Sequence, residues 1–374
     1  MNYLFTSESV TEGHPDKICD RIADTILDTC LASDSSSHVA CEVTATVDKV
    51  HIMGEITSAA HPDYEGIARN AIKQIGYCDA GHGFDYKTCD VEEDVHEQSP
   101  DIAMGVCKKN PLENGAGDQG MMFGFACKES AYYMPLAFEL ANNLTRRLEY
   151  VRKMFIIPEL LPDGKAQVTV EYKNNKPFRI DTVVLSSQHT ENIPLAELRM
   201  KLMDQVICAA LPVEMLDNST KYYINPTGRF VVGGPAGDTG LTGRKIIADT
   251  YGGYARHGGG SFSGKDPSKV DRSGAYMARF IAKNIVACGM AEKCEVQLSY
   301  AIGIAEPVSI YVDAFNTNKC PVEEIVSAIK SKEDLTPTGI IDKFGLNAPI
   351  YAPLSCHGHF GMNAAEMPWE KIEW

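Results

Sequence analysis

The sequence has little positive charge for its size, no closely spaced cysteine pair and no long apolar run. Its 35 lysines and arginines are outnumbered by 50 aspartates and glutamates, which gives a formal net charge of -15. A protein that binds nucleic acid over a broad face normally carries a basic stripe, so we expect no such partner. No apolar run approaches the ~18 residues that a membrane helix needs, so we also expect no membrane association.

Residues 1–8 lack the basic and apolar regions of a secretory signal, and we expect none. The 12 cysteines are scattered, and no two of them form a C-x-x-C pair. This spacing argues against a structural zinc site, and without a secretory signal a disulfide framework is not expected either. We therefore expect a cytoplasmic, reduced protein whose cysteines are mostly small core residues.

The composition is that of an ordinary globular protein, with 44% hydrophobic and 23% charged residues. A single hydrophobic core stops growing at roughly 250–300 residues, and the chain has 374, so two or three units are expected. Hydrophobic periodicity predicts the order helix, two hairpin strands, helix, and this order occurs three times. The predicted segments are 16–31, 41–47, 50–57 and 61–77, then 131–151, 167–172, 178–186 and 193–210, then 273–288, 295–302, 308–314 and 322–331.

The pattern predicts an α+β fold of three similar helix–hairpin–helix units. We expect a pseudo-threefold arrangement in which the sheets pack inward around a common centre and the helices lie outside. The predicted division of the chain is an N-terminal unit at 1–100, a mobile loop or linker at 101–114, a central unit at 115–232 and a C-terminal unit at 233–374.

Glycine-rich, charged stretches separate these elements, and loops on a rigid scaffold are where binding residues concentrate. They are residues 13–17, 98–120, 228–245 and 258–272. In the first, Pro15 and Asp16 suit a helix start; the alternative is that His14 and Asp16 form an anion and metal site at that helix end.

Two tetrapeptides, Gly117-Asp118-Gln119-Gly120 and Gly237-Asp238-Thr239-Gly240, each place an aspartate between glycines. Ordinary turns have this composition, and so do loops whose backbone approaches a ligand. The second tetrapeptide is soon followed by Arg244 and Lys245, and this cation pair favours a binding loop.

Residues 259–265 match G-x-x-x-x-G-K, but a P-loop is excluded by the context. Asp266 stands where a serine or threonine should hold magnesium, Pro267 follows, and no apolar strand comes before. The glycines and Lys265 can still cradle a phosphate through backbone N–H groups, although a solvated charged loop remains the plainer interpretation. The sequence 162–165 predicts a turn, and Glu42 and Glu55 are expected to face solvent.

Together the loops offer cations beside hard oxygen ligands, a combination typical of a polyphosphate bound with magnesium. The cations are Lys165, Arg244, Lys245, Lys265 and Lys269, and the carboxylates are Asp16, Asp118, Asp238 and Asp271. No Ser-His-Asp or Cys-His nucleophile stands out. The residues alone thus predict a magnesium-dependent enzyme that acts on a nucleoside polyphosphate.

Six segments together resemble the S-adenosylmethionine synthase (methionine adenosyltransferase) family, in its bacterial form. They are GHPDKICD at 13–20, QSPDIAMGV at 98–106, GAGDQGMMFG at 115–124, PDGKAQVTVEY at 162–172, NPTGRFVVGGPAGDTGLTGRKIIADTYGG at 225–253 and GGGSFSGKDPSKVDRS at 258–273. They follow the family order along nearly the whole chain.

The resemblance implies an enzyme of one-carbon metabolism that joins ATP to L-methionine. The sulfur attacks the ribose C5′ and displaces triphosphate, which is then hydrolysed to diphosphate and phosphate. A thioether sulfur carries no proton, so the first step needs no general base. The leaving triphosphate is highly charged, so it must be stabilised by positioned cations and metal ions. The absence of a Ser-His-Asp or Cys-His motif is therefore consistent with this reaction.

The resemblance also assigns roles to residues at matching positions. The ATP contacts are His14, Asp163, Lys165, Arg229, Phe230, Asp238, Arg244, Lys245, Ser261 and Lys265, and the catalytic set is His14, Asp118, Lys165, Arg244, Lys245 and Lys265. The methionine contacts are Glu55, Gln98, Asp238 and Lys269. Asp16 and Asp271 are implied as magnesium ligands, two ions per site, and Glu42 as a potassium ligand.

The family further implies a mobile lid at 98–108 and a homotetramer built from dimers, with each active site shared between two subunits. Ser261 stands where an alanine is typical, a change that preserves its backbone contact. Two alternatives differ in activity: a sensor that holds ATP without turnover, and a kinase-type phosphotransferase, which the rejected P-loop disfavours.

Overall fold

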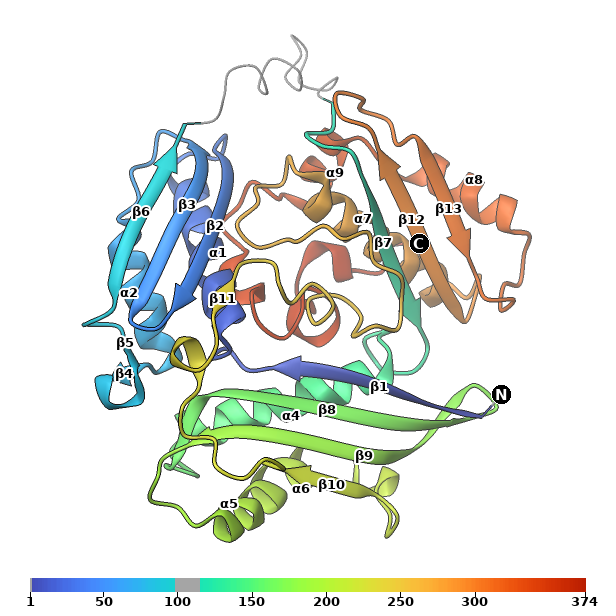
Figure 1. The fold of residues 1–374 in the computed structure, drawn as a ribbon. Helices are drawn as coiled ribbons and strands as arrows, with labels where there is room; N and C mark the ends of the chain where they lie inside the picture. Colours follow the sequence, from blue (N-terminus) through green and yellow to red (C-terminus); the bar gives the residue numbers. More distant parts are fainter. Residues whose placement is uncertain (1, 98–114) are drawn as a thin grey trace.

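A computed structural model describes residues 2–97 and 115–374 (Figure 1). Within these residues the strands form three sheets of three or four strands and one two-stranded ribbon, so the chain is a mixed α/β protein of several sheets, as the α+β prediction requires. The three sheets surround the middle of the molecule in Figure 1, and the C-terminal segment folds between them.

The first sheet has the strand order β11-β2-β3-β6 and packs against α1 and α2. Its elements are α1 (Pro15–Ser33), β2 (His38–Thr46), β3 (Lys49–Thr57), α2 (Tyr64–Ile75), β6 (Asp90–His96) and β11 (Gly240–Leu241), with the ribbon β4 (Cys78–Asp79) and β5 (Phe84–Asp85) nearby. Helix α2 begins after Asp63, whose side chain accepts the N–H of Gly66, and ends at Gly76 in the left-handed region, φ 113°.

The second sheet has the order β1-β8-β9-β10 and is covered by α4. Its elements are β1 (Tyr3–Val10), α4 (Leu136–Lys153), β8 (Leu160–Lys173), β9 (Lys176–His189), α5 (Leu195–Leu202), a π-helical turn (Met203–Ile207), α6 (Cys208–Ala210) and β10 (Lys221–Ile224). The predicted turn at Asn174 and Asn175 is confirmed, because both residues have positive φ, 52° and 62°.

The third sheet has the order β13-β12-β7 and packs against α7. Its elements are β7 (Gly120–Cys127), α7 (Val270–Ala287), β12 (Lys293–Tyr300), β13 (Ser309–Asp313), α8 (Val322–Lys332) and α9 (Pro337–Phe344). The sequence pattern predicted the hairpin β12–β13 with its flanking helices and missed β7 and α9.

Each sheet contains one predicted hairpin and takes a strand from elsewhere in the chain. Strand β1 pairs antiparallel with β8, β7 pairs antiparallel with β12, and the short β11 pairs with β2. The three parts are therefore tied together by backbone hydrogen bonds. The predicted unit boundaries and pseudo-threefold relation stay predictions.

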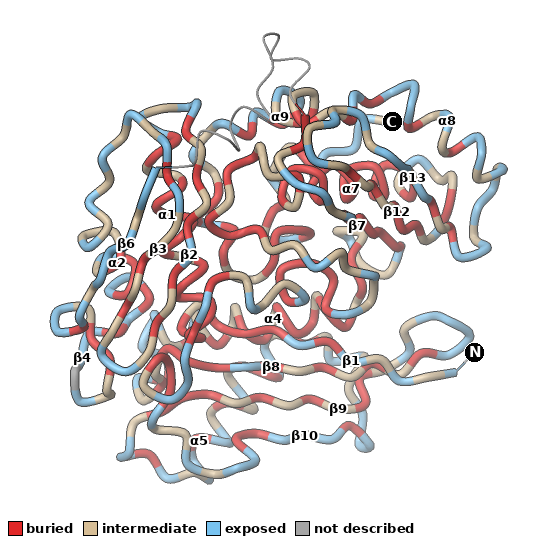
Figure 2. Tube along the Cα trace, turned by 45° about the horizontal axis from the view of Figure 1, so that its top comes forward, coloured by how far each residue is buried: buried red, intermediate tan, exposed pale blue. Residues whose placement is uncertain are grey.

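The predicted layer order, with helices outside, is wrong for α7. Every residue from Arg272 to Val286 is buried, so this helix lies inside the molecule (Figure 2). Its polar residues are paired internally: Arg272 with Asp24, and Arg279 with Glu370. Charged residues on a helix usually face solvent, and no local sign in the sequence shows that these arginines are paired in the interior. An outer helix was therefore predicted.

The predicted turn at 162–165 is also wrong, because these residues lie within β8. The strand is irregular there, and its register with β9 shifts between Leu160 and Gly164. Gly164 and Lys165 pair with β9, and Lys165 also pairs with Val10 of β1, so the second half of the segment is held extended despite its turn-forming residues.

The buried hydrophobic side chains of the described residues form two clusters. One contains side chains of the first and third sheets and their helices, and the other belongs to the second sheet, α4 and α5. Six of the eleven described cysteines are buried and all eleven are free thiols. Within the described residues, every helix falls short of the length and apolar character that a bilayer span requires.

Candidate active site

The start of α1 is built around a buried histidine. A side chain at residue 13 would lie 2.3 Å from the backbone of Pro162, so Gly13 lets this loop pack directly on β8. His14 is buried and its Nδ1 accepts the N–H of Asp16 at 3.2 Å, so the ring proton is on Nε2. Burial and the nearby Lys245 and Lys165 lower the pKa of His14 to about 3. The ring is therefore a neutral hydrogen-bond donor.

Asp16 lies in the first turn of α1 and joins this helix to β11 and to the loop that follows it. Its Oδ2 accepts from Lys245 Nζ at 2.5 Å and its Oδ1 from the Leu241 N–H at 2.9 Å. Arg244 Nε is 3.9 Å from the same carboxylate and its side chain is half exposed. Burial opposes the charge, but the hydrogen bonds from Lys245 and Leu241 hold the pKa of Asp16 below its ordinary value.

Strand β8 adds a buried acid and an exposed lysine. Asp163 Oδ2 accepts the Gly234 N–H at 2.8 Å, whereas its buried Oδ1 has no hydrogen-bond partner in the described part of the chain. Burial raises the pKa of Asp163 to about 6. Lys165 is exposed and forms no salt bridge with any described residue. Its charge is close enough to His14 to contribute to the low pKa of that ring.

A second group of charges lies where the loop before α7 meets β2. Lys265 forms an isolated antiparallel bridge with Ala40, and its Nζ is 2.7 Å from Asp271 Oδ2. Glu42 follows two residues after Ala40 on the same face of β2, and Glu55 pairs with Ala40 across the sheet. Burial raises the pKa of Glu42, Lys265 lowers it, and Glu55 adds to the rise. Two carboxylates therefore repel each other here beside one cation.

The two groups are named by their central residues. The His14 cluster consists of His14, Asp16, Asp163, Lys165, Arg244 and Lys245, and the Lys265 cluster of Glu42, Glu55, Lys265, Lys269 and Asp271. Among residues 2–97 and 115–374, no hydrogen bond or salt bridge joins a side chain of one cluster to a side chain of the other. The loops that carry them touch, because a side chain at Gly243 would lie 2.6 Å from Ser261.

A ladder of four aspartates on α1 positions the loops of both clusters. The carboxylates accept backbone N–H groups at 2.8–3.1 Å: Asp16 from Leu241, Asp20 from Gly243, Asp24 from Gly264, and Asp28 from Tyr351 and Ala352. Asp16 and Asp24 are eight residues apart, which is about 12 Å along the helix axis.

Three members of the ladder also meet a cation. Besides Asp16 with Lys245, Asp20 pairs with Lys17, and both oxygens of Asp24 accept from Arg272 Nη2, at 2.9 and 2.8 Å. The sequence motifs did not point to this ladder. The signal was present, since aspartate recurs at every fourth position from 16 to 28, the spacing that places side chains on one helix face.

Comparison with known proteins shows the family of the chain. The chain matches the family models of the S-adenosylmethionine synthetase N-terminal domain over residues 2–100, the central domain over 113–230 and the C-terminal domain over 232–371. The chain belongs to the S-adenosylmethionine synthetase family. It is 55% identical over 381 residues to the S-adenosylmethionine synthase of Clostridium tetani (strain Massachusetts / E88), a match that covers 100% of this chain and 97% of the relative.

The family resemblance seen in the sequence is thus confirmed, and the chain is a methionine adenosyltransferase, a transferase of S-adenosylmethionine biosynthesis. Four other family-implied residues, Arg229, Phe230, Asp118 and Asp238, form no hydrogen bond or salt bridge with a side chain of either cluster within the described part of the chain. Arg229 forms a surface salt bridge with Glu191, and the N–H of Phe230 donates to His189 Nε2 at 3.1 Å. Asp118 and Asp238 are exposed, and each accepts the N–H of the residue that follows it.

Lys269, a member of the Lys265 cluster, is paired with a residue outside that cluster. Lys269 forms a salt bridge with the buried Asp266, which also accepts the Val39 N–H at 2.7 Å. Asp266, the residue that ruled out a P-loop, is therefore a structural anchor for this loop. Gln98 and the predicted lid at 98–108 lie outside the described residues.

The carboxylates suit a hard divalent cation bound together with phosphates. Magnesium is commonly held by one or two carboxylates plus phosphate oxygens, with water completing the shell. Asp271 uses one oxygen for Lys265, and its other oxygen accepts no hydrogen bond from the described residues. Asp16 has both oxygens engaged, but a carboxylate offers about four lone-pair directions. Glu42 and Glu55, whose charges repel each other, offer further oxygen ligands for a cation.

Proposed function

We propose that the chain forms S-adenosylmethionine by attack of the L-methionine sulfur on the ribose C5′ of ATP, displacing triphosphate, which it then hydrolyses to diphosphate and phosphate. One observation carries the proposal: a neutral, buried His14 lies among Lys165, Arg244 and Lys245 at a helix start. Such a group of donors suits a leaving group that gains negative charge as the bond breaks.

The chain's own residues have distinct tasks in this reaction. His14 Nε2–H donates to the oxygen that leaves C5′, while Lys165, Arg244 and Lys245 stabilise the triphosphate charge. Lys265 belongs to the same catalytic set, and the further ATP contacts are Asp163, Arg229, Phe230, Asp238 and Ser261. No general base is needed, because the attacking thioether carries no proton.

Metal binding belongs to the same proposal. Asp16 and Asp271 would hold Mg²⁺, two ions per site, and Glu42 would hold K⁺; bound magnesium supplies charge neutralisation to the phosphates. The amines of Lys245 and Lys265 already hold these two aspartates in place. The methionine contacts are Glu55, Gln98, Asp238 and Lys269, with Asp118 completing the pocket.

The separation of the two clusters supports a shared active site. One chain offers the His14 cluster and the Lys265 cluster without a side-chain bond between them among the described residues. The aspartates Asp16 and Asp24, which hold the loops of the two clusters, lie about 12 Å apart along α1. In a two-fold dimer, the His14 cluster of one chain would face the Lys265 cluster of its partner, which gives two equivalent sites. We propose that such dimers pair into a homotetramer.

The test is an assay of the purified protein with ATP, L-methionine, Mg²⁺ and K⁺. The proposal predicts S-adenosylmethionine together with diphosphate and phosphate, and no adenosyl product when methionine is left out. Formation of ADP would instead indicate a kinase, and binding of ATP without turnover would indicate a sensor.

A further inference from the structure

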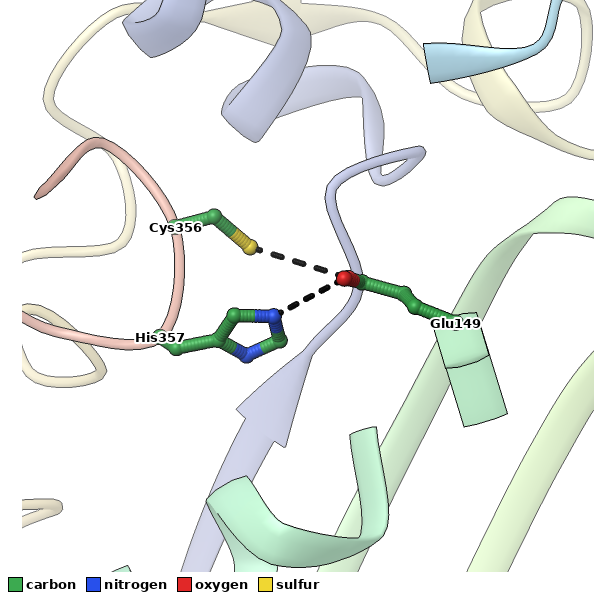
Figure 3. A group of neighbouring side chains, drawn as sticks. All are labelled: Glu149, Cys356 and His357. Carbon is green, nitrogen blue, oxygen red and sulfur yellow. Dashed lines mark hydrogen bonds and ion pairs between the residues drawn. The ribbon is translucent and has the colours of Figure 1, made fainter. Parts of the chain in front are cut away.

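A separate cluster of three possible metal ligands lies where α4 meets the C-terminal segment. Glu149 projects from α4, and Cys356 and His357 come from the loop after the short helix Ala352–Leu354; Figure 3 shows all three side chains converging. His357 Nε2 is 3.0 Å from Glu149 Oε2, and Cys356 Sγ is 3.9 Å from Glu149 Oε1. The three ligand atoms lie within 4.8 Å of one another.

This spacing is close to that of a tetrahedral zinc site. Zn–N and Zn–O bonds of about 2.0–2.2 Å and a Zn–S bond of about 2.3 Å place ligand atoms roughly 3.3–3.7 Å apart. The observed separations therefore require side-chain shifts of about 1 Å or less to accept one ion. Thiolate, imidazole and carboxylate are together the ligand types that zinc prefers, whereas magnesium and calcium take oxygen ligands.

The surroundings hold the ligands in position. Thr145 Oγ1 lies 3.2 Å from His357 Nδ1, and this contact leaves Nε2 to face Glu149. The backbone of His357 has φ 65°, a left-handed conformation that histidine adopts infrequently and that must be held by its neighbours.

The carboxylate of Glu149 is free of competing lysine and arginine pairs. Within the described residues its one ion-pair partner is His357, because Arg152 and Lys153 are engaged by Glu12 instead. The Glu12 N–H donates to Glu149 Oε1 at 2.7 Å and fixes its direction. An ion here would therefore add positive charge beside a carboxylate that no lysine or arginine of the described chain neutralises directly.

We propose that Glu149, Cys356 and His357 form a binding site for one zinc-like divalent transition-metal ion, separate from the active site. Binding displaces the thiol proton of Cys356 to solvent, leaves all oxidation states unchanged and keeps the fourth coordination position for water. The ion would clamp the C-terminal segment to α4.

The test is titration of the full-length protein with Zn²⁺ against a competing chelator, with Co²⁺ as the spectroscopic probe. Wild type should bind one tight equivalent of Zn²⁺ and show a thiolate-to-cobalt absorption band. Cys356→Ser should abolish that band, and both Cys356→Ser and His357→Asn should weaken Zn²⁺ at least about 10–100-fold, the loss seen when even an outer-shell partner is removed.

Cys320→Ser is the matched control, because Cys320 is also half buried and lies outside the cluster. It should retain both the Zn²⁺ equivalent and the cobalt band. Circular dichroism checks the fold, and Zn²⁺ should raise the unfolding temperature of wild type and Cys320→Ser but not of the two ligand variants. Absence of a tight equivalent in wild type, or its retention in Cys356→Ser and His357→Asn, would overturn the proposal.

Discussion

The His14 cluster and the Lys265 cluster both pair a lysine with an aspartate, but they differ in how the protein encloses the acid. The side chain of Asp16 is 2% exposed beside Lys245, whereas that of Asp271 is 21% exposed beside Lys265. The acid of the His14 cluster is therefore enclosed by its own chain, whereas the acid of the Lys265 cluster opens toward solvent. This difference suggests that the open cluster receives its remaining partners from another molecule.

The comparison also separates the residues that position a cluster from those that belong to it. Asp20 and Asp24 are fully buried, and they hold the loops through the N–H groups of Gly243 and Gly264. The buried ladder on α1 thus holds the loops of both clusters, from aspartates Asp16 and Asp24 that lie about 12 Å apart along the helix axis.

The largest effect on stability is expected from the middle of the ladder. Asp24→Asn should lower the free energy of unfolding by about 3–5 kcal/mol, because it leaves the buried Arg272 without its charge partner. Asp271→Asn, which breaks the more exposed pair with Lys265, should cost no more than about 1 kcal/mol. Urea unfolding of both variants measures the difference. Equal losses of unfolding free energy would contradict the claim that the buried pair contributes more to stability than the exposed pair.

The next effect concerns the exposed cation of the His14 cluster. Lys165→Met should lower the turnover number for S-adenosylmethionine formation roughly 10²–10³-fold, the cost of removing one preorganised transition-state donor. Stability should change little, since the lysine is exposed and forms no salt bridge within the described residues. Lys176→Met, at an exposed position on the same β8–β9 hairpin, is the control and should keep near wild-type turnover. Near-normal turnover in Lys165→Met would show that Lys165 has no catalytic role and is only a structural residue of β8.

The smallest effect concerns Asp28, the ladder member that lacks a salt bridge among the described residues. Burial raises its pKa from 3.8 to about 6, although the N–H groups of Ala352 and Tyr351 oppose the shift. The folded state then binds more protons than the unfolded state between these values, so stability falls as pH rises from about 4 to about 6 and is level above that.

Asp28→Asn removes this titration. Measured by urea unfolding at several pH values, the stability of wild type relative to Asp28→Asn should decline by about 2 kcal/mol from pH 4 to pH 6. A shift of about two pKa units is worth about 3 kcal/mol in total, and the rest of the change falls outside this range. A constant difference across this range would contradict the raised pKa.

The sequence predicted the local elements better than their arrangement. The three hairpins with their flanking helices are close to the predicted ranges, because alternation and the helical stripe are local signals. Strands β1, β7 and β11 were missed as members of distant sheets, since pairing between segments far apart leaves no local pattern. The buried face of α7 was missed because its arginines find carboxylates on other elements.

The site shows the same limit. Family motifs named the residues of both clusters, yet no motif indicated that Lys245 binds Asp16 or that Lys265 binds Asp271. The aspartate ladder was readable from its spacing of four, and was overlooked because the apolar stripe of the same helix gave the stronger signal. The metal-ligand triad joins residues over 200 positions apart, so spacing could not reveal it.

The central claim is that the two clusters complete one active site from two chains. It is tested by a mixed dimer of His14→Asn with Lys265→Met, each inactive alone, co-expressed with different tags. One site of this dimer collects both changes and the other is intact, so the doubly tagged species should recover up to about half of the wild-type activity. If each chain built its own site, both sites would carry a lesion. Doubly tagged dimers as inactive as their parents, with both tags shown to lie within one dimer, would contradict the shared site.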